Sequence, residues 1–159
     1  MMKAMLPGTF DPPTNGHLNL IERAASIFDK LYIIIADNFA KTCTFSVEER
    51  KSMLRQLLLK YENIEVLSWN RMVVDFAREY DVKVMLRGVR ALADFSYEFE
   101  LAMTNKQLNP GIEIFFMPTD PQYFVLRSSA IKELAAFGAD ISKMVPPIVA
   151  DLLIKKIKN

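Results

Sequence analysis

Apolar segments of strand length alternate with helical patterns along the chain, and this alternation limits the possible folds. The predicted strands cover residues 2–6, 31–36, 63–68, 82–86 and 112–117, and the predicted helices cover residues 17–28, 46–59, 72–80, 95–108, 128–137 and 146–157. Residues 31–36 (LYIIIA) are almost all apolar, as expected for a parallel strand that is buried on both faces. We therefore predict an α/β fold, a Rossmann-like doubly wound parallel sheet of about five strands with helices on both faces.

Length and composition favour a single domain that covers residues 1–159. The net charge of +1 gives no electrostatic reason to expect nucleic acid or a membrane as partner. One cysteine, Cys43, excludes an internal disulfide and argues against a cysteine metal site. The sequence has no signal-peptide pattern and no apolar run near the roughly 20 residues of a membrane helix. The expected location is the cytoplasm.

A loop rich in glycine and proline, residues 7–17 (PGTFDPPTNGH), connects the first predicted strand to the first predicted helix. Its glycines, Gly8 and Gly16, would let the backbone approach a ligand closely or adopt a positive φ. A helix that begins near Gly16 directs unpaired N–H groups and a positive dipole end into the loop, which suits a phosphate group. The only histidine of the chain, His17, stands here. The alternative is an ordinary tight turn with a surface or core histidine.

Two cationic segments follow other predicted strands. Residues 38–41 (NFAK) follow the second strand, and residues 87–90 (RGVR) follow the fourth. Because ligands bind at the carboxyl ends of parallel strands, we expect both segments to meet the loop at residues 7–17. Two arginines that flank a glycine suit bidentate contacts to phosphate, although a charged surface turn would have the same composition. Glu98, farther along, is either solvated or able to accept hydrogen bonds from a ribose.

Residues 123–129 (YFVLRSS) lead into the helix predicted after the fifth strand. Ser128 is a natural N-cap for that helix, which would be a purely structural role. The same hydroxyl and backbone N–H groups would also suit a second anion site.

These motifs together resemble a known enzyme family. The loop at residues 7–17 resembles the signature of the HxGH nucleotidyltransferases, with Thr14 in the place of the first histidine. Residues 45–50 (FSVEER), 86–102 (LRGVRALADFSYEFELA) and 115–118 (FFMP), with the serine pair, extend this resemblance to the bacterial phosphopantetheine adenylyltransferases over essentially the whole chain. The pattern at residues 87–98 is the most specific part, because it separates this family from other T-x-G-H enzymes.

The resemblance implies transfer of AMP from ATP to 4′-phosphopantetheine, which gives dephospho-coenzyme A and pyrophosphate. It also implies a Mg²⁺ requirement, a homohexamer built as a dimer of trimers, and feedback inhibition by coenzyme A. The implied catalytic residues are His17, Lys41 and Arg87. The implied acceptor-binding residues are Thr9, Lys41, Val73 and Arg87. The implied ATP-binding residues are Thr9, Phe10, His17, Gly88, Val89, Arg90, Glu98, Tyr123, Phe124, Val125, Leu126, Arg127, Ser128 and Ser129.

Two positions depart from the pattern of this family. Phe39 stands where proline is usual, and Arg127 stands where a hydroxyl residue is usual. We expect these departures to alter affinity and not to abolish the reaction, because Lys41 and the serine pair are present.

The residues present suit such a transfer. The attacking group is a phosphate whose second pKa is about 6, so the reaction needs no general base. It needs two phosphates held together and donors directed at the charge that develops. No acidic cluster is evident in the loops, so we expect no protein ligand to a metal and Mg²⁺ carried by ATP and water.

Two other functions remain open. One is a nucleotidyltransferase with a different phosphate acceptor, such as nicotinamide mononucleotide. The other is a non-catalytic adenine-nucleotide sensor, although His17, Lys41 and Arg87 would be unnecessary in a sensor.

Overall fold

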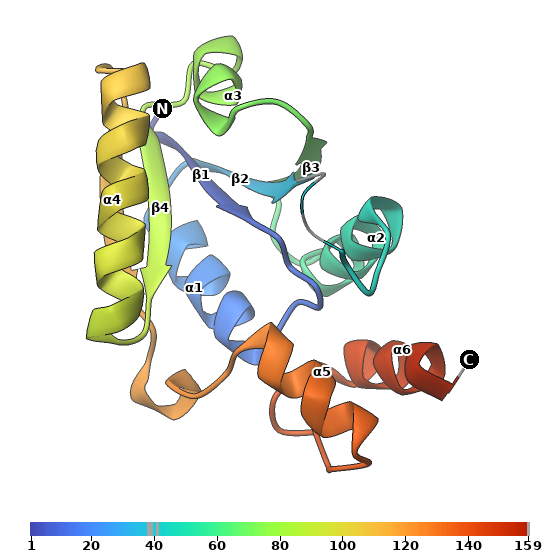
Figure 1. Ribbon diagram of the computed structural model, residues 1–159. Helices are drawn as coiled ribbons and strands as arrows, with labels where there is room; N and C mark the ends of the chain where they lie inside the picture. The colour runs from blue at the N-terminus through green and yellow to red at the C-terminus, as the bar shows by residue number, and fades with distance from the viewer. Residues whose placement is uncertain (38–39, 41, 159) are drawn as a thin grey trace.

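The computed structural model describes residues 1–37, 40 and 42–158, and it shows a central sheet flanked by helices (Figure 1). The sheet contains five parallel strands in the order β3-β2-β1-β4-β5. Its strands are β1 (Lys3–Gly8), β2 (Lys30–Ala36), β3 (Ile64–Trp69), β4 (Val84–Val89) and β5 (Glu113–Pro118). This topology confirms the predicted doubly wound α/β fold.

Helices cover both faces of the sheet. On one face α1 (Asn15–Ala25) and α2 (Val47–Leu57) pack on Leu31, Ile33 and Ile35 of β2. On the other face α3 (Val73–Glu79) packs on Tyr32 and Ile34 of the same strand, and α4 (Leu92–Leu108) reaches Met85 through Asn105. Alternate residues of a strand point to opposite faces. Both faces of β2 are therefore buried, which explains the nearly unbroken apolar run.

The C-terminal part forms a smaller cluster beyond the sheet. It contains the short 3-10 helix η1 (Pro121–Tyr123), α5 (Ser128–Ala136) and α6 (Pro147–Lys158). Ile131 of α5 and Val149 and Leu153 of α6 pack with Phe45 and Met53, so α2 joins this cluster to the sheet. Figure 1 shows α5 near the carboxyl end of β1. None of the helices in the described ranges is long and apolar enough to span a membrane.

Most boundaries differ from those predicted by one to three residues. β1 continues through Pro7 and Gly8, and α1 begins at Asn15, all inside the predicted loop at residues 7–17. Three further differences concern β4, α4 and η1. β4 continues through Arg87, Gly88 and Val89, which we expected in a loop, because these residues pair with β5. α4 begins at Leu92, three residues before the predicted start, and its N-cap, Ala91, offers no side-chain hydrogen bond. The predicted loop at residues 118–126 contains η1. The starts of α4 and η1 were not predicted because neither helix has a capping side chain, the feature from which a sequence pattern predicts a helix start.

Candidate active site

A cavity of about 590 Å³ lies where the strand order reverses, between β1 and β4. The two strands pair at Ala4–Val84 and Met5–Met85. Past these pairs, the cavity is lined by Leu6, Pro7 and Gly8 of β1 and by Arg87 and Gly88 of β4. Such a reversal is the usual ligand site of a doubly wound sheet, and the volume is typical of small-molecule pockets.

The loop after β1 folds over a buried aromatic ring. Phe10 is only 2% exposed and adopts a positive φ of 51°. A Cβ on Gly8 would lie 2.8 Å from that ring, so this packing requires glycine at position 8. The Phe10 ring also meets the His17 ring edge-on, at 5.0 Å between centroids. The buried Phe10 ring therefore packs against the His17 ring and helps to fix its position.

His17 closes the N-terminus of α1. Thr14 is the N-cap, and its hydroxyl accepts a hydrogen bond from the backbone N–H of His17 at 3.2 Å. In return, the backbone N–H of Thr14 donates to Nδ1 of His17 at 3.0 Å. This is a capping box in which histidine replaces the usual Glu or Gln. Because Nδ1 accepts from an N–H group, it carries no proton, and the neutral ring holds its proton on Nε2.

The surroundings keep this ring neutral. Removal of the ring from water, together with the positive charge of Arg90, lowers the pKa of His17 from 6.5 to about 4. The ring lines the cavity, and no residue in the described part of the chain accepts a hydrogen bond from Nε2. His17 thus offers the cavity one N–H donor and no proton-accepting nitrogen.

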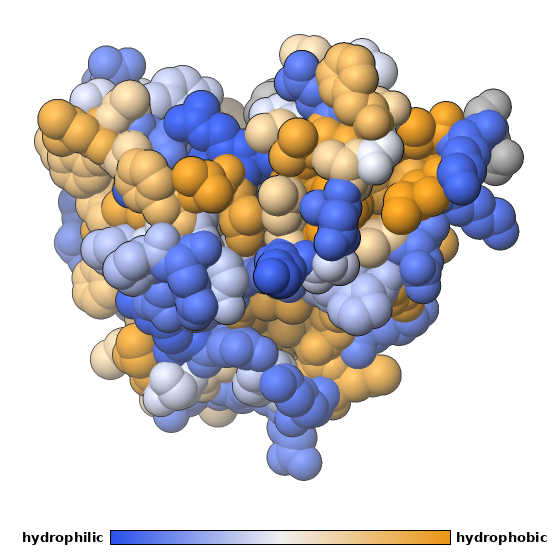
Figure 2. Space-filling model, turned by 90° about the horizontal axis from the view of Figure 1, so that it is seen from below, coloured by the Kyte–Doolittle hydropathy of each residue, from blue (hydrophilic) through white to orange (hydrophobic). Residues whose placement is uncertain are grey.

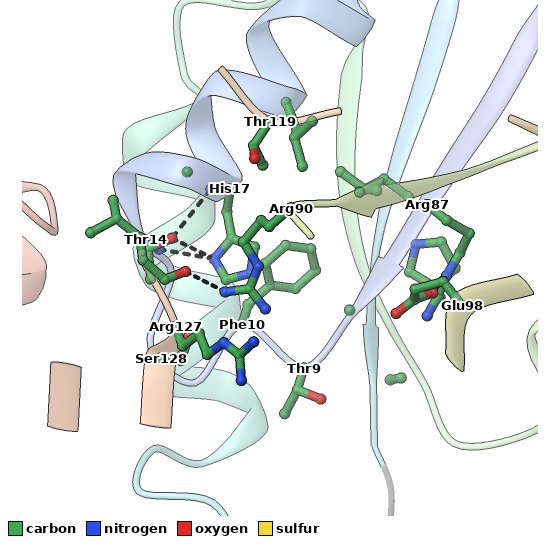
Figure 3. Close-up of a pocket in the computed structure, with 18 of the residues that line it drawn as sticks. Thr9, Phe10, Thr14, His17, Arg87, Arg90, Glu98, Thr119, Arg127 and Ser128 are labelled. Atoms are coloured by element: carbon green, nitrogen blue, oxygen red, sulfur yellow. Dashed lines mark hydrogen bonds and ion pairs between the residues drawn. The ribbon is translucent and has the colours of Figure 1, made fainter. Parts of the chain in front are cut away.

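Cations gather on the same side of the cavity as His17 (Figure 3). Arg90 donates to the carbonyl oxygen of Leu126 at 2.6 Å and pairs with Asp94 at 3.1 Å. Arg127 approaches the second oxygen of Asp94 at 3.4 Å, with 56% of its side chain exposed. The Asp94 carboxylate therefore holds two guanidinium groups near the N-terminus of α5.

Ser128 does not have the expected N-cap role. It is the first residue of α5, the N-cap is Arg127, and no side chain caps the helix. The Ser128 hydroxyl instead donates to the carbonyl oxygen of Pro12 at 2.9 Å. This bond ties the start of α5 to the loop after β1.

Arg87 and Glu98 occupy the other side of the cavity, across from His17 in Figure 3. Their side chains form an ion pair, and each is only 18% exposed. The pair links the end of β4 to α4. Thr9 lies between this pair and the His17 group in the same view.

The structure brings together most of the predicted site residues. The cavity lining includes Thr9, Phe10, His17, Val73, Arg87, Gly88, Arg90, Glu98, Leu126, Arg127, Ser128 and Ser129. Other predicted ATP-binding residues lie outside this lining, namely Val89, Tyr123, Phe124 and Val125. Lys41 and Phe39 fall outside the described residues. The ligand contacts of all these residues remain predictions.

Several residues at the site were not predicted. Arg50, which is 2% exposed, donates to the carbonyl oxygens of Thr9 at 2.8 Å and of Phe45 at 3.1 Å. Asp94 bridges two arginines, and Thr119 lines the cavity. Arg50 and Asp94 stand inside the motifs at residues 45–50 and 86–102, which was the available signal.

Comparisons with known proteins identify the family of this chain. Residues 5–134 match the model of the cytidylyltransferase-like family. Phosphopantetheine adenylyltransferase of Dictyoglomus turgidum is 45% identical, over 99% of both chains. The enzyme of the same name from Prochlorococcus marinus (strain MIT 9301) is 49% identical, over 93% of this chain and 94% of its own. The Streptomyces coelicolor enzyme is 40% identical, over 100% of this chain and 99% of its own.

A solved structure from Vibrio parahaemolyticus, provisionally assigned as a nicotinate-nucleotide adenylyltransferase, superposes with a TM-score of 0.73. It covers 99% of this chain and 95% of its own, at 17% identity, and so supports the fold alone. The identities above, over nearly full length, establish the relationship. The chain belongs to the family of bacterial phosphopantetheine adenylyltransferases.

Proposed function

We propose that the cavity transfers AMP from ATP to 4′-phosphopantetheine, which makes the protein a nucleotidyltransferase of coenzyme A biosynthesis. An oxygen of the acceptor phosphate forms a bond to the α-phosphorus of ATP. The bond from that phosphorus to the oxygen bridging to the β-phosphate breaks, and pyrophosphate leaves. The observation that carries the proposal is a neutral His17 beside Arg90, across the cavity from Arg87.

The protonation state of His17 suits donation and not base catalysis. Nδ1 accepts a hydrogen bond from the backbone N–H of Thr14, and Nε2 already holds a proton. A phosphate acceptor is ionised at neutral pH, so no base is required. We therefore assign Nε2–H to a non-bridging oxygen of the α-phosphate, where negative charge builds in the transition state.

The ATP half of the site would combine cations with a helix end. The first N–H groups of α5, with the hydroxyl of Ser129, suit the β- and γ-phosphates. Arg90 and Arg127 add positive charge beside them. Glu98 is the group proposed to accept hydrogen bonds from the ribose.

The carboxylates in and around the cavity are poor candidates for binding Mg²⁺. Asp11 is paired with Lys132, Asp94 with two arginines and Glu98 with Arg87. Within the described residues, no three or more acidic, His or Cys side chains are arranged so that they could hold a metal ion. Mg²⁺ in this proposal arrives on the phosphates of ATP, whose charge it neutralises.

The acceptor half would use Arg87 with Thr9, Val73 and Lys41. Arg87 presents a fork of N–H donors that matches a phosphate. In the structure, Glu98 pairs with Nε of this guanidinium group. Binding of the two substrates would exchange this ion pair for contacts to phosphate and ribose.

An assay of pyrophosphate release with several acceptors tests the function. Purified protein with ATP and Mg²⁺ would receive 4′-phosphopantetheine, nicotinamide mononucleotide or no acceptor, and CTP would replace ATP as a control. We expect release with ATP and 4′-phosphopantetheine only. Release with nicotinamide mononucleotide would favour the alternative acceptor, and ATP binding without release from any acceptor would favour a sensor.

We also propose a homohexamer that coenzyme A inhibits. Large apolar side chains are exposed along α4 and β5, including Leu92, Tyr97, Phe99, Met103 and Phe115. Apolar side chains also reach the surface between polar ones on the face shown in Figure 2. Contiguous exposed apolar surface often marks a subunit interface. Light scattering should give the mass of six chains, and a stable monomer at assay concentration would contradict the proposal.

A further inference from the structure

A second cavity, of about 430 Å³, adjoins the first. The two cavities share Thr9, Phe10, His17, Ser128 and Ser129. The second is also lined by Asp11, Thr42, Cys43 and Lys132. Thr42 and Cys43 directly follow in sequence Lys41, the residue predicted to hold the acceptor phosphate.

Asp11 is the carboxylate that binds the walls of this cavity to one another. It is only 5% exposed, and each of its oxygens accepts a backbone hydrogen bond at 2.8 Å: Oδ2 from Thr44 and Oδ1 from Phe45. Oδ2 also accepts from Nζ of Lys132 at 2.9 Å. One side chain thereby connects the loop after β1, the segment that precedes α2, and α5.

Neighbouring bonds reinforce the same junction. Arg50 of α2 donates to the carbonyl oxygen of Thr9, two residues before Asp11, and to that of Phe45, whose N–H donates to Asp11. The Ser128 hydroxyl holds the carbonyl oxygen of Pro12. The backbone on either side of Asp11 is therefore fixed to α2 and to α5.

Asp11 is ionised in this setting. Burial raises the pKa of Asp11, but the hydrogen bonds from Lys132 and from the N–H groups of Phe45 and Thr44 outweigh burial and lower the pKa below its ordinary value. A bare carboxylate would repel phosphate groups in the adjoining cavity. Lys132 neutralises this charge, so both oxygens can hold backbone N–H groups without that repulsion.

We propose that Asp11 is a positioning residue that keeps residues 42–45, on the acceptor side, in register with the ATP side of the site, and that Lys132 is its counter-ion. This inference rests on the proposed function for its kinetic consequences. Asp11 does not touch the reacting atoms; it acts through the backbone of Thr44 and Phe45. A shift of about 1 Å in a reacting group can cost about a hundredfold in rate, so a loosened segment should have a large effect.

The test compares Asp11→Asn with Glu49→Gln as a matched control. Glu49 also accepts a backbone N–H, from Ser46, and also pairs with a lysine, Lys156, but it lies on the surface. We expect Asp11→Asn to lower kcat/KM for 4′-phosphopantetheine by about 10- to 100-fold, while the KM for ATP stays nearly unchanged. Glu49→Gln should keep both constants near those of the wild type.

A second readout does not depend on activity. Cys43 is the single cysteine and lines the second cavity, so its rate of labelling by a thiol reagent reports on residues 42–45. Without ligands, labelling should be several-fold faster in Asp11→Asn than in the wild type or Glu49→Gln. Wild-type labelling together with wild-type kinetics in folded Asp11→Asn would overturn the proposal.

Lys132→Met provides a test even if Asp11→Asn does not fold, because it changes no residue of the loop after β1 and keeps both backbone hydrogen bonds of Asp11. We expect faster Cys43 labelling and a lower kcat/KM for the acceptor. Weakened ATP binding with unchanged labelling would overturn the proposal, since Lys132 would then be a phosphate ligand. If wild-type protein transfers no AMP, the proposed function fails, but the labelling comparison still decides the role of Asp11.

Discussion

The tautomer of His17 leads to a prediction that separates catalysis from stability. Nδ1 accepts from the N–H of Thr14, whereas Nε2–H faces the cavity. In His17→Asn, the amide oxygen can take the place of Nδ1, but the side chain is too short to donate from the position of Nε2. In His17→Gln, the amide can cap Thr14, as Gln does in ordinary capping boxes, and its NH₂ group reaches farther into the cavity. His17→Ala can do neither.

The expected magnitudes follow from these two bonds. A lost donor to transition-state charge typically costs about 3 kcal/mol, or roughly 10²–10³ in rate. His17→Ala and His17→Asn should therefore lose at least about that factor in the chemical step, and His17→Gln should lose less. Thr14 is buried, and an unpaired buried N–H costs about 1–3 kcal/mol. His17→Ala should lose stability by that amount, and His17→Asn should lose little.

Single-turnover rapid-quench kinetics of dephospho-coenzyme A formation would measure the chemical step, because product release often limits kcat. Urea unfolding of the same variants would measure stability. A chemical step in folded His17→Ala within a few-fold of the wild type would refute the donor assignment. Equal rates for His17→Asn and His17→Gln would also refute it, because the position of the donor would then be irrelevant.

Three further predictions follow from the charges at the site. The pKa of His17 is about 4 in the folded protein against 6.5 ordinarily, so the unfolded chain takes up its proton first as the pH falls. The free energy of unfolding of the wild type should then drop between pH 6.5 and about 4, by up to about 1.4 kcal/mol per pH unit, and that of His17→Asn should drop less. NMR titration of this single histidine should show a neutral ring, protonated on Nε2, at pH 6. A titration midpoint near 6.5 would contradict the prediction. Arg87→Ala should impair the reaction strongly and change the ATP affinity measured by calorimetry little. A loss of ATP affinity with unchanged affinity for 4′-phosphopantetheine would contradict the assignment of Arg87 to the acceptor half of the site. Arg127→Ser should weaken ATP binding a few-fold at low salt and less at high salt, whereas unchanged affinity at low salt would show that Arg127 is merely solvated.

The fold could be predicted because its main signals are local. The apolar run at residues 31–36 fixed a buried central strand, and Ser46 with Glu49 formed the predicted capping box of α2. The starts of α4 and η1 were missed because no side chain caps them, and the end of β4 was missed because tertiary pairing decides it. Residues 87–89 look like a polar turn, yet they extend β4 because β5 lies beside them.

The site could be predicted only in part. Convergence of the loop after β1 with Arg87 of β4, and with Arg90 just beyond the end of β4, followed from the direction of parallel strands. The pairing of Asp11 with Lys132 joins residues 121 apart in sequence, and no periodic pattern links them. The neutral state of His17 could not be assigned either, since it depends on Thr14 and Arg90 in three dimensions.

The most direct test of the central claim is to follow the oxygen atoms of the acceptor. If the acceptor phosphate attacks the α-phosphorus of ATP, 4′-phosphopantetheine labelled with ¹⁸O in its phosphate should give dephospho-coenzyme A that keeps all of the label. Mass spectrometry should find unlabelled pyrophosphate. Label in pyrophosphate or in free AMP, or no dephospho-coenzyme A at all, would contradict direct adenylyl transfer in this cavity.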